Sequence, residues 1–132
     1  MLTIKNVADI VGESTHTIRY YAKEGLFPFL TRDKNGVRLF KDEDIEGVRI
    51  VLCLRDTNMP ISEIKKYMEL CKQGASTIKQ RLAIIQKQKE RVYEQLNILQ
   101  EKIHHLEQKE QFYINAIAAG DSDKCNPFTE HK

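Results

Sequence analysis

Apolar residues recur every three or four positions along the last third of the chain. Steps of four and three residues visit twelve positions, ten of them apolar or aromatic: Ile78, Leu82, Ile85, Lys89, Val92, Leu96, Leu99, Ile103, Leu106, Glu110, Tyr113 and Ile117. This heptad spacing predicts one long helix over residues 76–118 with an apolar seam along one side. A helix of about 43 residues extends roughly 65 Å. A small domain cannot bury an apolar seam of this length. The seam therefore predicts a partner helix, most simply that of a second copy.

Two positions of this seam are charged, Lys89 and Glu110, and they lie on either side of its centre. In an antiparallel pair centred near Leu99 or Gln100, Lys89 of one chain approaches Glu110 of the other. In a parallel pair Lys89 would face Lys89, which costs energy. The charges thus predict an antiparallel coiled coil. The alternative is that both side chains reach outward to solvent and say nothing about direction.

Two short helical patterns open the chain. Residues 4–11 carry apolar side chains at helical spacing, with Thr3 as a capping residue and Gly12 at the end. Residues 15–24 form a second pattern, capped by Ser14 or Thr15 and ended by Gly25. Two short helices across a tight turn that contains glycine make a helix-turn-helix. The second helix of such a motif carries side chains into the major groove of DNA.

A hairpin is predicted directly after this motif. The runs 29–32 and 37–40 have extended character, and Asn35-Gly36 between them is a strong hairpin signal. A hairpin in this place is a wing, which can lay cations on the DNA backbone. Residues 14–41 hold six cations against two acidic residues, a net charge of +4 within a chain whose net charge is +2. This concentration favours a DNA-binding face; the alternative is an ordinary solvated surface.

Two further helices are expected between the wing and the seam. Asp42 is predicted to cap the third helix, whose apolar face includes Ile45, Val48, Leu52 and Cys53. The fourth runs over about residues 62–72. The predicted fold is therefore mostly α: a winged helix-turn-helix DNA-binding domain at 1–74, an antiparallel coiled-coil dimerisation helix at 76–118 and a flexible tail at 119–132.

The composition of the chain excludes several classes of protein. The 132 residues include no apolar run that could span a bilayer and no secretory leader pattern, and the three widely spaced cysteines do not form a disulfide framework. We expect a cytoplasmic protein that contacts no membrane. An enzyme is disfavoured, since no nucleophile–base pair, phosphate-cradling glycine loop or complete metal motif is present, and we expect no cofactor. His104 and His105 are interpreted as ordinary surface residues beside the seam.

Five motifs in order along residues 2–118 resemble the MerR family of bacterial transcription regulators: Thr17-Ile18-Arg19-Tyr20-Tyr21 with Gly25-Leu26, Asn35-Gly36-Val37-Arg38-Leu39-Phe40, Asp44-Ile45, Leu54-Arg55 and Ile61-Ser62-Glu63-Ile64-Lys65. The resemblance implies a homodimer whose two winged motifs grip palindromic, double-stranded promoter DNA. It also implies that the dimer bends and untwists an over-long spacer so that RNA polymerase can engage. Val37 stands where the family usually has tyrosine, a departure that concerns one phosphate contact and not the fold.

The resemblance also assigns the DNA contacts. On the recognition helix these are Thr17, Arg19 and Tyr20, with His16 near its start facing the bases; Arg38 is the phosphate contact of the wing, and Lys65 or Lys66 adds a phosphate contact from the fourth helix. Tyr21 is interpreted as a core residue rather than a contact, because it lies beside Ile18 on the apolar side.

The cysteines are the candidate residues for sensing an effector. The segment 48–55 around Cys53 is similar to the MerR subgroup that senses aldehydes and other electrophiles through a single cysteine at this place. Arg49, one helical turn earlier, is close enough to favour the nucleophilic thiolate. The plain alternative is that Cys53 is a small buried core residue. A second alternative is a metal-responsive regulator that uses Cys71 and Cys125, and an alternative of another class is a coiled-coil protein-interaction adaptor.

Overall fold

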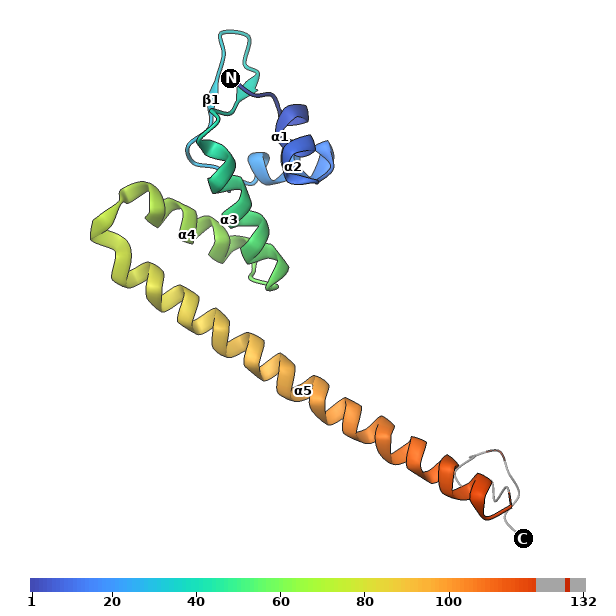
Figure 1. Cartoon of the computed structure of the whole chain (residues 1–132). Coiled ribbons are helices and arrows are strands. Elements are labelled where there is room, and N and C mark those ends of the chain that lie inside the picture. Colours follow the sequence, from blue (N-terminus) through green and yellow to red (C-terminus); the bar gives the residue numbers. More distant parts are fainter. Residues whose placement is uncertain (121–127, 129–132) are drawn as a thin grey trace. The chain divides into compact units, whose positions relative to one another are not determined.

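The structure is a computed structural model that describes residues 1–120 and residue 128. Figure 1 shows its elements in chain order: α1 (Ile4–Val11), α2 (Thr15–Lys23), β1 (Thr31–Arg32), β2 (Arg38–Leu39), α3 (Asp44–Asp56), α4 (Ile61–Gln73), a short 3-10 helix (Ala75–Thr77) and α5 (Ile78–Ala118). The chain divides into two units, Met1–Lys89 and Glu90–Lys132. The predicted mostly helical fold, with a winged helix-turn-helix followed by one long helix, is confirmed.

Side-chain caps fix where α1 and α2 begin. Thr3 and Asn6 form a reciprocal capping box, in which the Asn6 backbone N–H donates to Thr3 Oγ1 at 3.2 Å. Ser14 caps α2 by accepting from the Thr17 backbone N–H at 3.1 Å. Gly25, with a left-handed φ of 82°, follows the end of α2 as predicted.

The core of the first unit lies where α1, α2, α3 and α4 meet. Its fully buried side chains come from each of these elements and from the segments around the wing: Val7, Ile18, Leu26, Phe40, Val48, Val51 and Ile64. Phe27 contacts the Phe40 ring edge-on, with ring centroids 5.8 Å apart. This core orients α2, because Ile18 and Tyr21 are its buried side chains. The prediction that Tyr21 is a core residue is confirmed.

Gly47 in α3 allows a close approach of Phe29. A β-carbon placed at Gly47 would lie 2.6 Å from Phe29 Cε1, which is closer than real β-carbons come to other atoms. The aromatic ring therefore occupies the space that any other residue would fill. This contact holds the segment after α2 against the first half of α3.

The wing is a two-stranded antiparallel hairpin anchored at its base. Thr31 pairs with Leu39 and Arg32 with Arg38, and an additional bridge joins Leu2 to Phe40. At the tip, the Asp33 carboxylate accepts from the backbone N–H groups of Asn35 and Val37 at 2.8 and 2.9 Å. The Asn-Gly signal therefore identified the turn correctly.

The start of α3 differs from the prediction at Asp42. The helix begins at Asp44, and no side chain caps it at Glu43. The Asp44 carboxylate instead accepts from the Lys41 backbone N–H at 2.8 Å. Because Asp44 lies in the first turn, its charge is still favourable to the helix dipole.

A tight corner joins α4 to α5. The buried Thr77 hydroxyl bonds the carbonyls of Leu70 and Gly74, at 2.6 and 2.8 Å. Arg81 donates to Thr77 Oγ1 at 3.1 Å and to the Gly74 carbonyl at 3.3 Å. The long helix therefore starts at Ile78, two residues later than predicted, because a 3-10 turn precedes it.

The seam of α5 is uncovered in the single chain. All ten of its apolar or aromatic residues are exposed, from Ile78 to Ile117. Folding of one chain thus leaves this stripe in water, an arrangement typical of a surface that a partner covers. Within residues 1–120, no helix combines the length and the apolar character needed to cross a bilayer.

Candidate nucleic-acid interface

Helix α2 presents a polar face opposite its buried one. His16, Arg19 and Tyr20 are exposed, and Lys23 in the last turn lies on the same side. Because Ile18 and Tyr21 are held in the core, the helix cannot turn this face away from solvent. A cationic and aromatic face fixed in this way can bond both base edges and phosphate oxygens.

Thr17, a predicted DNA contact, also takes part in the hydrogen bonds that cap α2. Its side chain is half-buried, and its Oγ1 accepts a hydrogen bond from the Ser14 hydroxyl at 2.9 Å. The Thr17 hydroxyl proton remains available to an acceptor outside the protein. Thr17 can therefore help to close the start of α2 and also contact DNA.

Lys65 of α4 lies against the end of α2. Its Cε is 3.1 Å from the place where a β-carbon of Gly25 would be. A cation near the carboxyl end of a helix is favourable to the helix dipole. Both Lys65 and its neighbour Lys66 are exposed, so α2 and α4 together present cations to solvent.

The wing adds a pair of arginines that face each other across the hairpin. Arg38, half-buried, pairs in register with the exposed Arg32. The Arg32 Nη1 donates to the Gly36 carbonyl at 3.1 Å, which bends its side chain along the hairpin. Like charges directly opposite in a hairpin are unfavourable, unless an anion lies over them. Arg32 is not among the contacts predicted from the sequence, although the turn at Asn35-Gly36 already sets it opposite Arg38.

Cys53 is exposed, so its interpretation as a buried core residue is wrong. The apolar face of α3 passes through Val48, Val51 and Leu52 instead. Cys53 lines a surface pocket with residues of the helix-turn-helix and of α3: Val11, Glu13, Arg49, Leu52, Arg55, Asp56 and Thr57. Arg49, one turn before Cys53, is only loosely paired with Glu46, at 3.8 Å.

Cys71, the described cysteine of the metal alternative, is not among the residues that line this pocket. Cys71 is half-buried in α4. Burial raises the pKa of the Tyr67 hydroxyl above its ordinary value, and the neighbouring Cys71 raises it further. Cys125 lies outside the described residues. Among residues 1–120 and 128, no three metal-ligating side chains of the histidine, cysteine and acidic types gather together.

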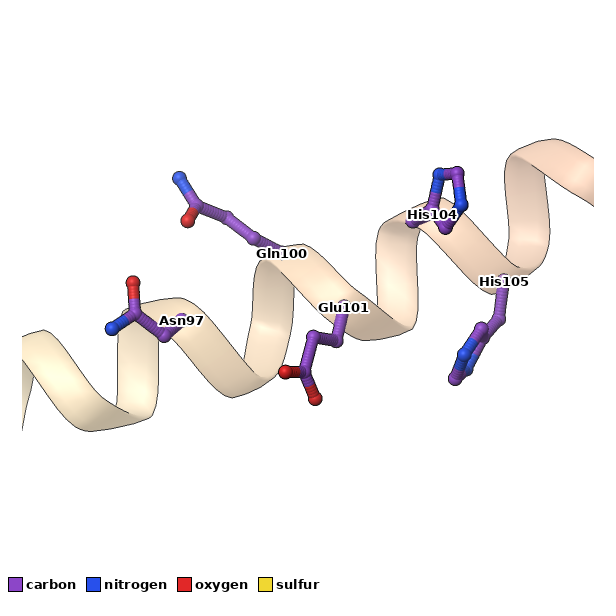
Figure 2. A pocket seen from close by; sticks show the side chains of 5 residues that line it. All are labelled: Asn97, Gln100, Glu101, His104 and His105. Carbon is purple, nitrogen blue, oxygen red and sulfur yellow. The ribbon is translucent and has the colours of Figure 1, made fainter.

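The histidine pair on α5 belongs to a shallow hollow on one side of the helix. Figure 2 shows its five lining residues, Asn97, Gln100, Glu101, His104 and His105, with the two histidine side chains pointing away from each other. Their ring centroids are 6.4 Å apart. Side chains that diverge in this way do not form a joint site within one chain.

The fold and this surface define a winged helix-turn-helix DNA-binding protein. The family model described as MerR HTH family regulatory protein matches residues 2–71. The chain belongs to the MerR family and is a DNA-binding transcriptional regulator, not an enzyme.

Individual relatives agree with this assignment. A Haemophilus influenzae HTH-type transcriptional regulator is 36% identical over 124 residues, which cover 94% of this chain and 92% of the relative. The HTH-type transcriptional regulator AdhR of Bacillus subtilis is 30% identical over 93 residues, 70% of this chain and 66% of AdhR.

Solved structures show the same likeness. HiNmlR, a MerR family regulator lacking the sensor domain and crystallised bound to promoter DNA, has 36% identity and a TM-score of 0.70, covering 89% of this chain and 94% of that one. A MerR family regulator from Bacillus thuringiensis has the same identity and TM-score, covering 85% of this chain and 98% of its own.

Proposed function

We propose that this regulator acts as a homodimer that binds a palindromic operator in promoter DNA. It bends and untwists the promoter spacer so that RNA polymerase can engage. Because it acts on promoter DNA together with RNA polymerase, we place it in the cytoplasm. The observation that carries the proposal is the uncovered seam of α5 on a chain that also holds a winged helix-turn-helix. A dimer covers the seam and supplies two recognition helices, one for each half of a palindrome.

One particular antiparallel alignment of two α5 helices pairs every seam position of one chain with a seam position of the other. When Leu96 lies across from the partner's Leu99, each of the twelve positions faces another seam position, and the centre falls between Asn97 and Ile98 rather than near Leu99. In this register the partner's Glu110 lies one helical turn from Lys89. The two charges that interrupt the seam therefore attract each other across the dimer.

Each half of the dimer contacts DNA through two elements. Arg19, Tyr20, His16 and Thr17 of α2 enter the major groove, where Arg19 pairs with a guanine edge or a phosphate. Arg38 and Arg32 of the wing bind backbone phosphates, which offsets their mutual repulsion. Lys65 and Lys66 of α4 add phosphate contacts beside the end of α2.

The effector in this proposal is an aldehyde or a related electrophile, and the sensor is Cys53. Its support is the exposure of Cys53 in a pocket that carries Arg49, together with the likeness to AdhR and HiNmlR. The thiolate sulfur attacks the carbonyl carbon and forms a sulfur–carbon bond. The carbonyl electron pair moves to oxygen, which takes up one proton, so the thiol and the aldehyde give a neutral hemithioacetal.

Operator binding is tested by a gel shift with an inverted repeat from the DNA upstream of its own gene. We expect a single retarded complex whose affinity falls steeply as salt rises, because phosphate contacts displace counterions. Absence of any salt-dependent complex would overturn the proposed operator binding.

The sensor is tested by Cys53→Ser, with Cys71→Ser as the matched control. We expect Cys53→Ser to abolish aldehyde-induced transcription from a reporter promoter and to leave operator binding unchanged, whereas Cys71→Ser keeps the induction. Brief aldehyde treatment should also protect Cys53 from alkylation in peptide mass spectrometry. Full induction in the Cys53→Ser protein refutes the sensor role and leaves the operator proposal standing.

A further inference from the structure

An ion pair joins the turn of the helix-turn-helix to the far end of α3. Arg55 Nη2 lies 2.8 Å from Glu13 Oε1. Glu13 sits in the turn between α1 and α2, directly before Ser14, the residue that caps α2. Arg55 is the penultimate residue of α3. The pair therefore spans two elements that are 42 positions apart in the sequence.

The pair is better shielded than an ordinary surface ion pair. The side chains of Arg55 and Glu13 are 31% and 23% exposed. By comparison, the Arg49–Glu46 pair on the same helix is longer, at 3.8 Å, and its side chains are 52% and 81% exposed. Partial exclusion of water strengthens the attraction between Arg55 and Glu13.

Arg55 also reaches the recognition helix. Its pKa is raised above its ordinary value, first by the hydrogen bond to Glu13, then by Asp56 and to a smaller extent by the Tyr21 hydroxyl, while burial opposes the rise. Tyr21 is a buried side chain of α2. The guanidinium thus bonds the turn before α2 and interacts with the inner face of α2 itself.

We propose that the Glu13–Arg55 ion pair sets the orientation of α2 that operator binding requires. Arg55 is a positioning residue in this account, and the proposal rests on the proposed role of α2 as the recognition helix. The turn is bonded to α1 by the Glu13 backbone N–H, which donates to the Ala8 carbonyl at 3.0 Å. The side chain of Glu13 adds the tie to α3, so the start of α2 is held from two sides.

Glu13→Gln separates positioning from simple electrostatics, because the two predict opposite signs. Removal of a carboxylate beside a DNA-binding helix makes the surface more cationic, which by itself tightens binding to DNA. Loss of the tie to Arg55 leaves α2 less well oriented, which weakens binding to the operator. A decrease in operator affinity therefore identifies a positioning role.

The experiment measures operator affinity by fluorescence anisotropy at several salt concentrations for full-length variants that circular dichroism shows to be folded at the assay temperature. We expect Glu13→Gln and Arg55→Gln each to weaken binding by about tenfold, and the double variant to be no weaker than Arg55→Gln alone. The salt dependence should match that of the unmodified protein, since neither residue contacts phosphate. Glu46→Gln is the matched control, because it breaks an ion pair within α3 only, and it should not weaken binding.

Three results would overturn the proposal: unchanged or tighter operator binding by Glu13→Gln, additive losses in the double variant, or a shallower salt slope for Arg55→Gln, which would mark Arg55 as a phosphate contact. Arg19→Ala in the same assay tests the recognition role of α2 separately. If Arg19→Ala binds normally, the recognition proposal fails; if only the Glu13 and Arg55 variants bind normally, the positioning inference fails.

Discussion

The side-chain amide of Gln88 donates a hydrogen bond to the backbone carbonyl of Thr57 across 2.8 Å. Gln88 is buried ten residues after the first residue of α5, and Thr57 directly follows the end of α3. The contact therefore ties the first turns of the long helix to the junction between α3 and α4. Thr57 also lines the Cys53 pocket, as does Arg55. One of these lining residues is therefore bonded to Gln88 of α5, and the other is paired with Glu13 in the helix-turn-helix.

Removal of the Gln88 amide should destabilise the protein. In Gln88→Leu the donor to Thr57 is lost inside a buried site, and we expect the free energy of unfolding to fall by about 1–2 kcal/mol. Chemical denaturation of the full chain measures it. Gln88→Glu keeps the shape but places a carboxylate against a carbonyl, so it should be at least as destabilising. A fully stable Gln88→Glu protein would contradict this view of the contact.

Gly47→Ala should be destabilising although alanine is the better helix former. The added methyl group collides with the Phe29 ring, and we expect a loss of about 1–3 kcal/mol in the free energy of unfolding. Thermal or denaturant unfolding checks it. The control is the same substitution in a Phe29→Ala background, where the clash is absent and Gly47→Ala should be neutral or stabilising. An equal loss in both backgrounds would assign the cost to something other than Phe29.

Charge reversal tests the antiparallel register of the proposed dimer. Lys89→Glu places like charges near the partner's Glu110, and we expect each single reversal, Lys89→Glu or Glu110→Lys, to weaken dimerisation by about fivefold. The double reversal restores the attraction and should restore the affinity, as measured by analytical ultracentrifugation. If the double variant dimerises no better than the singles, Lys89 and Glu110 do not meet.

The two wing arginines should each contribute to salt-dependent DNA binding. Because a dimer carries two copies, loss of one phosphate contact per chain should reduce the slope of log affinity against log salt by about 2. We expect this for Arg38→Ala and for Arg32→Ala. Lys87→Ala removes an exposed cation from α5 on the side away from the seam and should leave the slope unchanged. An unchanged slope for Arg32→Ala would exclude it as a phosphate contact.

The elements of the first unit were predictable because their signals are local. Thr3, Ser14 and Gly25 mark the ends of α1 and α2, and Asn35-Gly36 marks the wing turn, each through chemistry within a few residues. The heptad pattern located α5 for the same reason. Asp42 was misjudged as a cap because Asp44, also nearby, bonds the Lys41 N–H instead.

The contacts between distant segments were not predictable in the same way. Nothing near Arg55 in the sequence indicates Glu13, and nothing near Gln88 indicates Thr57, because only the packing of α1, α3 and α5 brings them together. Cys53 shows the limit of periodicity: it follows the apolar Leu52, yet the helix turns it to solvent. The register that sets Arg32 opposite Arg38 could be read from the turn, since pairing about a known turn is fixed.

In the proposed dimer, two copies of α2 read two halves of one operator. Hydroxyl-radical footprinting of the full-length protein on its own upstream DNA tests it most directly. We predict two protected half-sites related by a two-fold axis, both of which disappear together in Arg19→Ala at protein concentrations that saturate the unmodified protein. Protection of a single half-site, or protection that Arg19→Ala leaves intact, would contradict the account.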